Sequence, residues 1–435
     1  MSAGWAAVGL LLPAMSLALA RSSCADPPAP GDNLLRNGDF EQGANGAPEA
    51  WTHDAWQPER SVFAWEPAGG VGGSRCISIT TGGEPNDAWW KQTLQLEPRT
   101  GYLLRGQIRA ENVELVEQGA WVGANLCQLG VFGCSSDVER SKGSFDWADF
   151  QVDFVTGESG SIEIGCRLGH WNSTVKGKAY FDSLALTRNP QVTRREGQHI
   201  YLNLYDDDAA TITPEHYDRW VAHLDAAYEA MADLVGHAPF GGAKIGIYSS
   251  MWYPGGYAVA GNPIYWHQRY VQEMLRAADE KDDWSFGLVH EIGHDFDEDG
   301  SWNFHGEFWA NFKLYYVMET LNARIDDYVG ADQIRYWKTD SGISYEKAWL
   351  DPGPAKRVAS NDGFQYKMIL IRQKIGWEPF KRTFRYFLSL PESERPTDNW
   401  SKLKLFHDKL TEFSGYDVWT LYTPDDLKLM KAEYR

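Results

Sequence analysis

The spacing of apolar positions divides the chain into two parts. From Asn33 to about Asn189, short runs alternate apolar and polar side chains, with Gly, Pro and Asp between the runs. A period of two predicts β-strands with one buried face, and regular turn signals between short strands predict an antiparallel sandwich. The alternation is found in Ser61–Trp65, Cys76–Thr80, Tyr102–Ile108, Phe150–Phe154 and Ser161–Gly165.

The second part changes to helical spacing. Two strands are expected at His199–Tyr205 and Lys244–Tyr248, on either side of a helix that Thr213 caps, with Pro214 in its first turn and an end near Gly236. Further helices are expected at Phe364–Ile375, Pro379–Leu388, Lys402–Phe413 and after Thr423.

The predicted fold is therefore multidomain. An antiparallel β-sandwich of the jelly-roll type at residues 33–190 is followed, after a linker around Pro190–Gly197, by an α+β, mainly helical domain at residues 198–435. Ahead of both, Trp5 to Ala20 is apolar and ends in an A-x-A cleavage pattern, which predicts a signal peptide at residues 1–20 and a secreted or extracellular protein. The alternative is an uncleaved anchor that holds the protein at the cell surface.

A five-residue motif, HEIGH, runs from His290 to His294 in the helical part. Residues four apart lie on the same face of a helix, so the two imidazoles can bind one Zn²⁺, with Glu291 directed at the same water. With 11 histidines in 435 residues, this motif arises by chance in roughly 2% of such chains.

The residues that follow supply a third ligand. The segment from Asp295 to Asn303 is rich in Asp, Gly and Asn and is expected to be a loop, and Glu307 then begins a second helical run. Helix, loop and helix can bring the two histidines and Glu307 onto one ion, which leaves a fourth position open for catalysis. Asp282 and Asp283 suit the start of the first helix, and Asn311 is a candidate to orient the Glu307 carboxylate.

The run from Phe286 to Leu321 resembles the M60-like, enhancin-type metallopeptidases, whose HExxH motif is completed by a later Glu. The stretch Ala258–Ile264 and the C-terminal Gln365-Tyr366 and Gly376-Trp377 are also similar to that family. The resemblance covers about residues 198–435.

By this resemblance His290, His294 and Glu307 are the zinc ligands and Glu291 is the catalytic base of a gluzincin-type peptidase. Zinc lowers the pKa of its bound water to about 7 and polarises the scissile carbonyl, while the glutamate accepts the water's proton and returns it to the leaving amine. The chain departs from the family in carrying Asp295 and Asp297 after the second histidine.

The ends of the predicted sandwich resemble a carbohydrate-binding module of the galactose-binding-like type. The opening Asn33–Glu41 and the closing Ala179–Leu186 carry this likeness. In relatives these motifs can hold a structural Ca²⁺, for which Asp39, Glu41 and Asp182 are candidates; the alternative is that they are plain turn residues.

Tryptophan is unusually frequent, with 20 in the chain. Aromatic rings stack on the apolar faces of sugars, although half or more of these rings are expected to fill the core. The candidate platforms are Trp56, Trp89, Trp90, Trp121, Trp147 and Trp171.

Charge and cysteines narrow the partners. A net charge of −19 without a basic patch makes nucleic acid a poor partner, and no stable membrane insertion is expected once the signal is removed. Four cysteines cluster in the exported β-rich half, which predicts two disulfide bonds with three pairings open, while Cys24 is left over. The four are Cys76, Cys127, Cys134 and Cys166.

The function that these features favour is a secreted zinc endopeptidase that acts on glycoproteins, with mucin-like O-glycosylated chains as the implied substrate. The alternative is a glycan-binding, lectin-like protein whose zinc domain is inert or structural. A third hypothesis is a general proteinase whose sandwich only folds or docks. The intact Glu291 favours an active enzyme.

Overall fold

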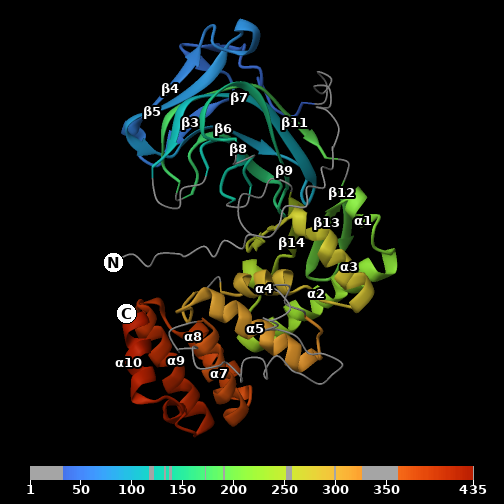
Figure 1. Ribbon diagram of the computed structural model, residues 1–435, viewed down its shortest axis with the longest axis vertical. Helices are drawn as coiled ribbons and strands as arrows, with labels where there is room; N and C mark the ends of the chain where they lie inside the picture. Colours follow the sequence, from blue (N-terminus) through green and yellow to red (C-terminus); the bar gives the residue numbers. More distant parts are fainter. Residues whose placement is uncertain are drawn as a thin grey trace, which may run out of the picture.

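The computed structural model describes most of the chain in three stacked parts (Figure 1). The sandwich lies at the top of the view, a further sheet with the first helices lies in the middle, and the C-terminal helices lie at the bottom. The predicted signal segment, Cys24 and Trp121 lie outside the described residues, which are 33–116, 122–131, 134–136, 140–171, 173–189, 192–250, 257–297, 300–325 and 361–434.

The N-terminal part is a sandwich of two antiparallel sheets, which confirms the predicted class. The four-stranded sheet has the order β3-β6-β10-β8, with β3 Thr52–Ala55, β6 Ala88–Gln95, β10 Ser161–Leu168 and β8 Ala124–Gln128. The five-stranded sheet has the order β4-β5-β11-β7-β9, with β4 Ser61–Glu66, β5 Cys76–Asn86, β11 Val175–Arg188, β7 Gly101–Leu115 and β9 Gly143–Val155. A short hairpin, β1 Gly43–Ala44 with β2 Ala47–Pro48, precedes them.

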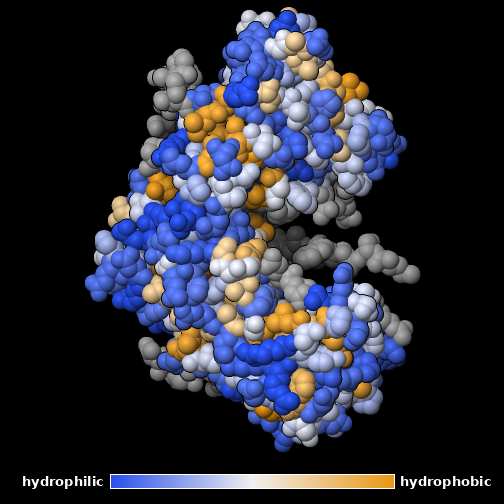
Figure 2. All heavy atoms as spheres, turned by 180° about the vertical axis from the view of Figure 1, so that it is seen from behind, coloured by the Kyte–Doolittle hydropathy of each residue, from blue (hydrophilic) through white to orange (hydrophobic). Residues whose placement is uncertain are grey.

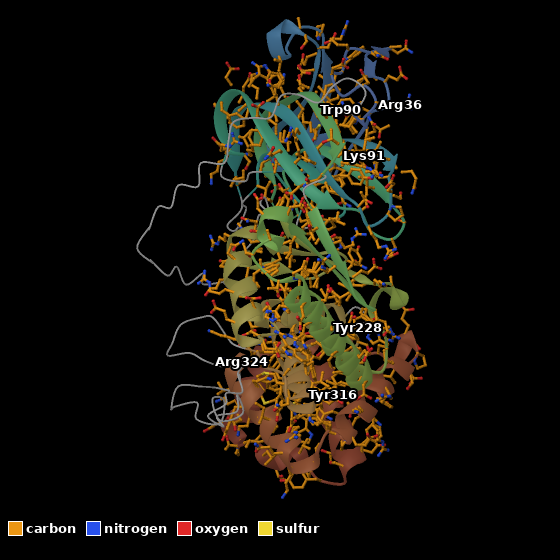
Figure 3. The ribbon with its side chains drawn as sticks, turned by 90° about the vertical axis from the view of Figure 1, so that its right-hand side faces the viewer. Arg36, Trp90, Lys91, Tyr228, Tyr316 and Arg324 are labelled. Carbon is orange, nitrogen blue, oxygen red and sulfur yellow. The ribbon has the colours of Figure 1, made fainter. Side chains whose placement is uncertain are left out.

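Alternation along the strands builds the sandwich core. In β7, Tyr102, Leu104 and Ile108 are buried, whereas the side chains between them are partly exposed. Trp90 on β6 is 3% exposed and packs in the same core, so at least one candidate sugar platform is a core residue (Figure 3).

A third sheet connects the sandwich to the helices. Its order is β12-β13-β14-β16-β15, in which β13, β14 and β16 are parallel and the two edge strands are antiparallel to their neighbours. The strands are β12 Val192–Glu196, β13 Ile200–Tyr205, β14 Ile245–Ser250, β16 Ile264–His267 and β15 Ala258–Val259. The linker expected around Pro190–Gly197 is therefore wrong for residues 192–196, which pair with β13 as an edge strand.

The two faces of this sheet are buried against different partners. Ile200, Leu202 and their neighbours on one face pack with the helices, whereas Tyr248 and Tyr265 on the other face belong to the sandwich core. Burial of both faces is usual for parallel strands.

Asp153 of β9 lies in the contact between the sandwich and this sheet. Tyr248 donates a hydrogen bond from its hydroxyl to Asp153 Oδ2 at 2.5 Å, Tyr205 donates to the same oxygen, and Ser250 Oγ lies 3.5 Å from Oδ1. The carboxyl group is 1% exposed, and burial raises its pKa. The sandwich is thus docked by a buried polar contact.

The helices form around the third sheet and below it. Thr213 caps α2 by accepting the N–H of His216, Gly236 ends it at a φ of 94°, and Thr423 and Asp426 form a capping box on α10, as the predicted signals require. The helices are α1 Asp206–Ala209, α2 Pro214–Val235, α3 Val271–Lys281, α4 Phe286–Asp295, α5 Gly306–Leu321, α7 Asn361–Ile375, α8 Glu378–Ser389, α9 Asn399–Ser414 and α10 Pro424–Glu433.

Helix α2 also holds α5 in place. Tyr316 on α5 donates its hydroxyl hydrogen to Asp233 on α2 at 2.6 Å, and Tyr228 on α2 packs edge-on against Phe296 just after α4 (Figure 3).

None of the helices in the described part of the chain has the length and apolar character needed to span a membrane. Figure 2 shows a largely hydrophilic surface with hydrophobic residues gathered over the sandwich.

The predicted disulfide bonds are wrong. Cys76, Cys127, Cys134 and Cys166 are buried free thiols, and burial raises the pKa of Cys127 to about 11. The strand register explains part of this result. Cys127 is paired with Gly165, so the Cys127 and Cys166 side chains point to opposite faces of the sheet, while Cys76 lies in the other sheet.

The three calcium candidates are engaged in turns. Asp182 accepts hydrogen bonds from the Val71 amide at 2.8 Å and from Ser74 Oγ at 2.9 Å, and Glu41 accepts one from the Arg75 amide at 2.7 Å. Asp39 does not join them in a three-ligand cluster within the described ranges. The contacts support the turn-residue alternative, and calcium binding stays a prediction.

Candidate metal centre

Helices α4 and α5 approach each other closely at a glycine. A Cβ atom built on Gly293 would lie 3.0 Å from the Ala310 carbonyl oxygen and 3.1 Å from its Cα. Leu288, Val289 and Ile292 bury the remaining faces of α4 in the core. The predicted pair of helices around a loop is thus confirmed, with the polar residues of the motif directed at the first turn of α5.

The two histidines of α4 and Glu307 of α5 come together. His290 Nε2 lies 3.0 Å from His294 Nε2 and 3.3 Å from Glu307 Oε2, and His294 Nε2 lies 3.6 Å from Glu307 Oε1. The histidine side chains are 11% and 21% exposed, and Glu307 is 51% exposed, so the cluster opens to solvent on the glutamate side.

These distances fit a single tetrahedral ion. Zinc with ligand bonds of about 2.0–2.1 Å places its donor atoms about 3.3 Å apart. The observed separations of 3.0, 3.3 and 3.6 Å, of which the last two go to different oxygens of the Glu307 carboxylate, lie near that value. Two imidazoles and one carboxylate are also a common catalytic zinc ligand set, and they are the one such cluster of three among the residues that the structure describes.

Asn311 fixes the orientation of the first histidine. Its Oδ1 lies 2.7 Å from His290 Nδ1, so that nitrogen carries the hydrogen and Nε2 is left with its lone pair toward the cluster. Asn311 is 3% exposed and lies one turn after Glu307. Asn311 was predicted to orient the Glu307 carboxylate, but its hydrogen bond is to His290 instead.

Electrostatic coupling within the cluster is strong. The hydrogen bond to His290 lowers the pKa of Glu307 to about 2, and burial together with the neighbouring His290 charge lowers the pKa of His294 to about 4. Burial alone would lower the pKa of His290. The neighbouring Glu307 and Glu291 carboxyl groups outweigh the effect of burial, so the pKa of His290 is raised. Two negative carboxyl groups thus favour a cation at this position.

Glu291 is half-buried beside the cluster. Burial raises the pKa of Glu291 to about 7, and a hydrogen bond from the backbone N–H of Ala260 acts in the opposite direction. Ala260 directly follows the edge strand β15, so this strand and the motif helix are joined at the carboxylate. The amide of Ala260 could not be identified from the sequence because a backbone donor leaves no side-chain signal.

The two aspartates that depart from the family pattern hold neighbouring elements. Asp295 Oδ1 accepts the N–H of Gly261 at 2.7 Å, which attaches the segment before β16 to α4. Asp297 Oδ1 accepts from Lys313 Nζ at 2.6 Å and from Trp302 Nε1 at 3.1 Å. Lys313 is fully buried in α5, and its place in an otherwise apolar helix was the sequence signal for this pair.

The start of α4 differs from expectation. Asp282 ends α3 in the left-handed conformation, and Asp283 accepts the N–H of Ser285 at 2.7 Å, so neither caps α4 directly. Ser285, the residue before the helix, has a φ of 70°. Tyr366 is half-buried on α7.

Comparison with known families agrees with this geometry. Residues 251–420 match the family described as peptidase M60, enhancin and enhancin-like. Two curated relatives, the tRNA nuclease WapA of Bacillus subtilis (strain 168) and the tRNA3(Ser)-specific nuclease WapA of Bacillus spizizenii, are each 26% identical over 166 residues. These stretches cover 36% of this chain but only 7% of each relative, so the chain spans a small part of their length.

Solved structures give more distant likenesses. A conserved protein of unknown function from Bacillus anthracis str. Ames covers 79% of both chains at 13% identity, with a TM-score of 0.42. TmCBM61 in complex with β-1,4-galactotriose covers 36% of this chain and 99% of its own at 15% identity and a TM-score of 0.25. A family 16 carbohydrate-binding module has the same coverage at 19% identity and a TM-score of 0.24. The sandwich itself is established by its own strand pairing.

Proposed function

We propose, from the enhancin-like peptidase M60 domain that residues 251–420 form, that this metallopeptidase uses zinc to cleave internal peptide bonds of glycoproteins. Mucin-like O-glycosylated chains are the proposed substrate class. The observation that carries the proposal is the His290, His294 and Glu307 cluster, whose donor atoms have the mutual spacing of a tetrahedral zinc site.

The chain's own residues divide the work. The two imidazoles and the Glu307 carboxylate would hold the metal, which supplies a more acidic water and an electrophile for the scissile carbonyl. Glu291, next to His290 and half-buried, is placed to accept the proton of that water and to donate it to the leaving amine. Asn311 keeps the His290 ring in its tautomer throughout.

The sandwich supports a glycosylated substrate. Trp56 and Trp171 on its surface are 62% and 48% exposed, unlike the buried Trp90. Exposed aromatic faces are suited to the apolar C–H faces of sugar rings. The net charge of −19 disfavours polyanionic ligands and favours neutral glycans. Secretion, by way of the apolar segment Trp5 to Ala20, is part of the same proposal.

The test is digestion of a purified mucin and of the same mucin after enzymatic deglycosylation. We expect the wild-type protein to cleave the glycosylated form faster, a chelator to abolish cleavage and added zinc to restore it. Glu291→Gln should lower the rate by at least a hundredfold, because proton transfer by a positioned base is worth about 10²–10⁴-fold. Glu273→Gln, an exposed residue of α3, is the matched control and should retain full activity.

The outcomes separate the hypotheses. Cleavage that survives Glu291→Gln or the chelator refutes the mechanism. Glycan binding with no cleavage under any condition indicates the lectin-like alternative, and equal cleavage of both mucin forms indicates a general proteinase.

A further inference from the structure

A hollow lies at one open side of the sandwich, between the edge strands of its two sheets. Strand β3 is the first strand of the four-stranded sheet and β4 is the first strand of the five-stranded sheet, and the chain crosses between them through a short 3-10 turn at Pro58–Arg60. The hollow measures about 450 Å³, within the range of about 300–1,000 Å³ that is usual for small-molecule sites. Its lining residues are His53, Asp54, Ala55, Pro58, Ser61, Val62 and Phe63.

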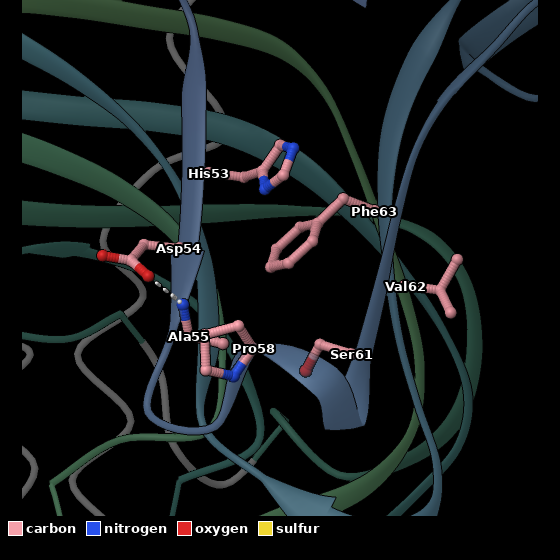
Figure 4. A pocket seen from close by; sticks show the side chains of 7 residues that line it. All are labelled: His53, Asp54, Ala55, Pro58, Ser61, Val62 and Phe63. Carbon is pink, nitrogen blue, oxygen red and sulfur yellow. Dashed lines mark hydrogen bonds between the residues drawn. The ribbon is translucent and has the colours of Figure 1, made fainter.

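The lining combines ring faces with hydrogen-bonding groups. Figure 4 shows the rings of His53 and Phe63 reaching toward each other from β3 and β4, with Pro58 and Ser61 below them. The two rings stack with centroids 4.2 Å apart and an interplanar angle of 16°. Ser61 adds a hydroxyl, whereas the Asp54 carboxylate lies on the other side of β3 and accepts the Ala55 N–H at 2.8 Å. A flat apolar wall with a few polar groups suits a pyranose, which has one apolar C–H face and a rim of hydroxyls.

The wall is rigid before any ligand arrives. The buried Trp90 packs edge-on against both rings. Its ring centroid lies 4.7 Å from that of His53 and 5.7 Å from that of Phe63. Burial lowers the pKa of His53, so its ring is neutral at neutral pH and offers one donor and one acceptor. A neutral, preformed site loses little entropy when it binds a sugar.

The connecting turn is also held from within. Asn86, which is fully buried, accepts the N–H of Gln57 and donates to the Gln57 carbonyl at 2.7 Å and to Ser61 Oγ at 2.8 Å. The backbone N–H of Trp56 donates a hydrogen bond to the Asp87 carbonyl oxygen at 2.9 Å, while the Trp56 side chain is 62% exposed. An exposed tryptophan on a fixed turn between two lining residues is a ready contact surface.

We propose that this hollow binds one or two neutral sugar units of a glycan, with Phe63 and the exposed Trp56 of the adjoining turn contacting the ring faces and His53 and Ser61 bonding the hydroxyls. The proposal rests on the glycoprotein function proposed above, because it makes the hollow the site that recognises the substrate's glycan. The hollow lacks a cationic lining side chain, which favours neutral sugars over sialic acid.

The test uses the full-length Glu291→Gln protein, so that cleavage does not disturb binding. Calorimetric titrations with galactose, N-acetylgalactosamine, N-acetylglucosamine and N-acetylneuraminic acid are compared among three variants. Trp56→Ala and His53→Ala change exposed side chains and should retain the wild-type unfolding temperature. Glu273→Gln is the control, since Glu273 is an exposed residue of α3 outside the sandwich.

We expect at least one neutral sugar to bind, N-acetylneuraminic acid not to bind, and each variant of the hollow to weaken binding about tenfold while Glu273→Gln binds normally. Absence of binding by all three neutral sugars overturns the proposal. Binding that is insensitive to Trp56→Ala and His53→Ala, or that is lost in Glu273→Gln, also overturns it. Cleavage of an unglycosylated peptide by the wild-type protein is measured separately, so that loss of the peptidase function and loss of the sugar site are distinguishable.

Discussion

Replacement of Gly293 by alanine tests whether the close contact of α4 and α5 sets the spacing of the metal ligands. Gly293 lies between the two histidines in sequence, and its added methyl group would meet the Ala310 backbone at 3.0–3.1 Å. Carbon atoms in good contact lie about 3.5–4.0 Å apart. The helices must therefore separate by roughly half an ångström, because the obstructing atoms are backbone.

The size of the effect follows from two opposing terms. Overpacking costs about 1–3 kcal/mol, and the gain from alanine over glycine within a helix is about 1 kcal/mol. The metal-free Gly293→Ala protein should thus lose only about 0–2 kcal/mol of stability. Ligand distances tolerate about 0.2 Å, so the same movement displaces Glu307 beyond the tolerated range, and zinc affinity should fall about 10–100-fold, or about 1.4–2.8 kcal/mol.

The assay is zinc titration against a competing chelator, with thermal unfolding of the metal-free protein measured in parallel. Gly306→Ala is the control, because a Cβ atom there lies 3.7 Å from His294 Cε1, an ordinary contact. If Gly293→Ala binds zinc as tightly as the wild-type protein, the helix contact does not set the ligand geometry. Equal losses in both variants would likewise refute the reasoning.

Three further predictions concern buried polar contacts. Asn311→Ala removes the partner of His290 Nδ1, and the same titration should show zinc affinity reduced about 10–100-fold. Lys313→Met leaves the Asp297 carboxylate buried without its cation, so urea denaturation should show a loss of about 3–5 kcal/mol, most of which Asp297→Asn in the same chain restores. Burial raises the pKa of Asp153, so the folded state holds that proton more tightly than the unfolded state and loses stability as pH rises from about 4 through the folded pKa. Asp153→Asn removes this linkage, and its free energy of unfolding relative to wild type should increase over that pH range; a constant difference contradicts the raised pKa.

The metal cluster could be predicted from the sequence because its geometry is local. Two histidines four apart share a helix face whatever the rest of the chain does, and the third residue begins the next helix. The strand pattern of the sandwich is local in the same sense, and the helix caps at Thr213 and Thr423 follow from residue type alone. These features are therefore found where they were predicted.

Contacts between distant segments could not be predicted in this way. Asp153 occupies a polar position in an alternating strand, which indicates exposure, yet the tyrosines of another sheet cover it. The segment Val192–Glu196 reads as a linker because it is polar, but charged residues are also what an edge strand carries. The number of cysteines gave no information on which face of a sheet each one occupies, and so the disulfide prediction failed.

The tyrosine-covered face of the third sheet determines how this protein can be divided. A fragment beginning near residue 198 would expose Tyr201, Tyr248 and Tyr265 to water. It would also lack β12, the edge strand that pairs with β13. Such a fragment should aggregate, even though it contains every ligand of the metal cluster. Any exchange of the N-terminal half for another sandwich must preserve the surface around Asp153, since that surface covers the tyrosines of the third sheet.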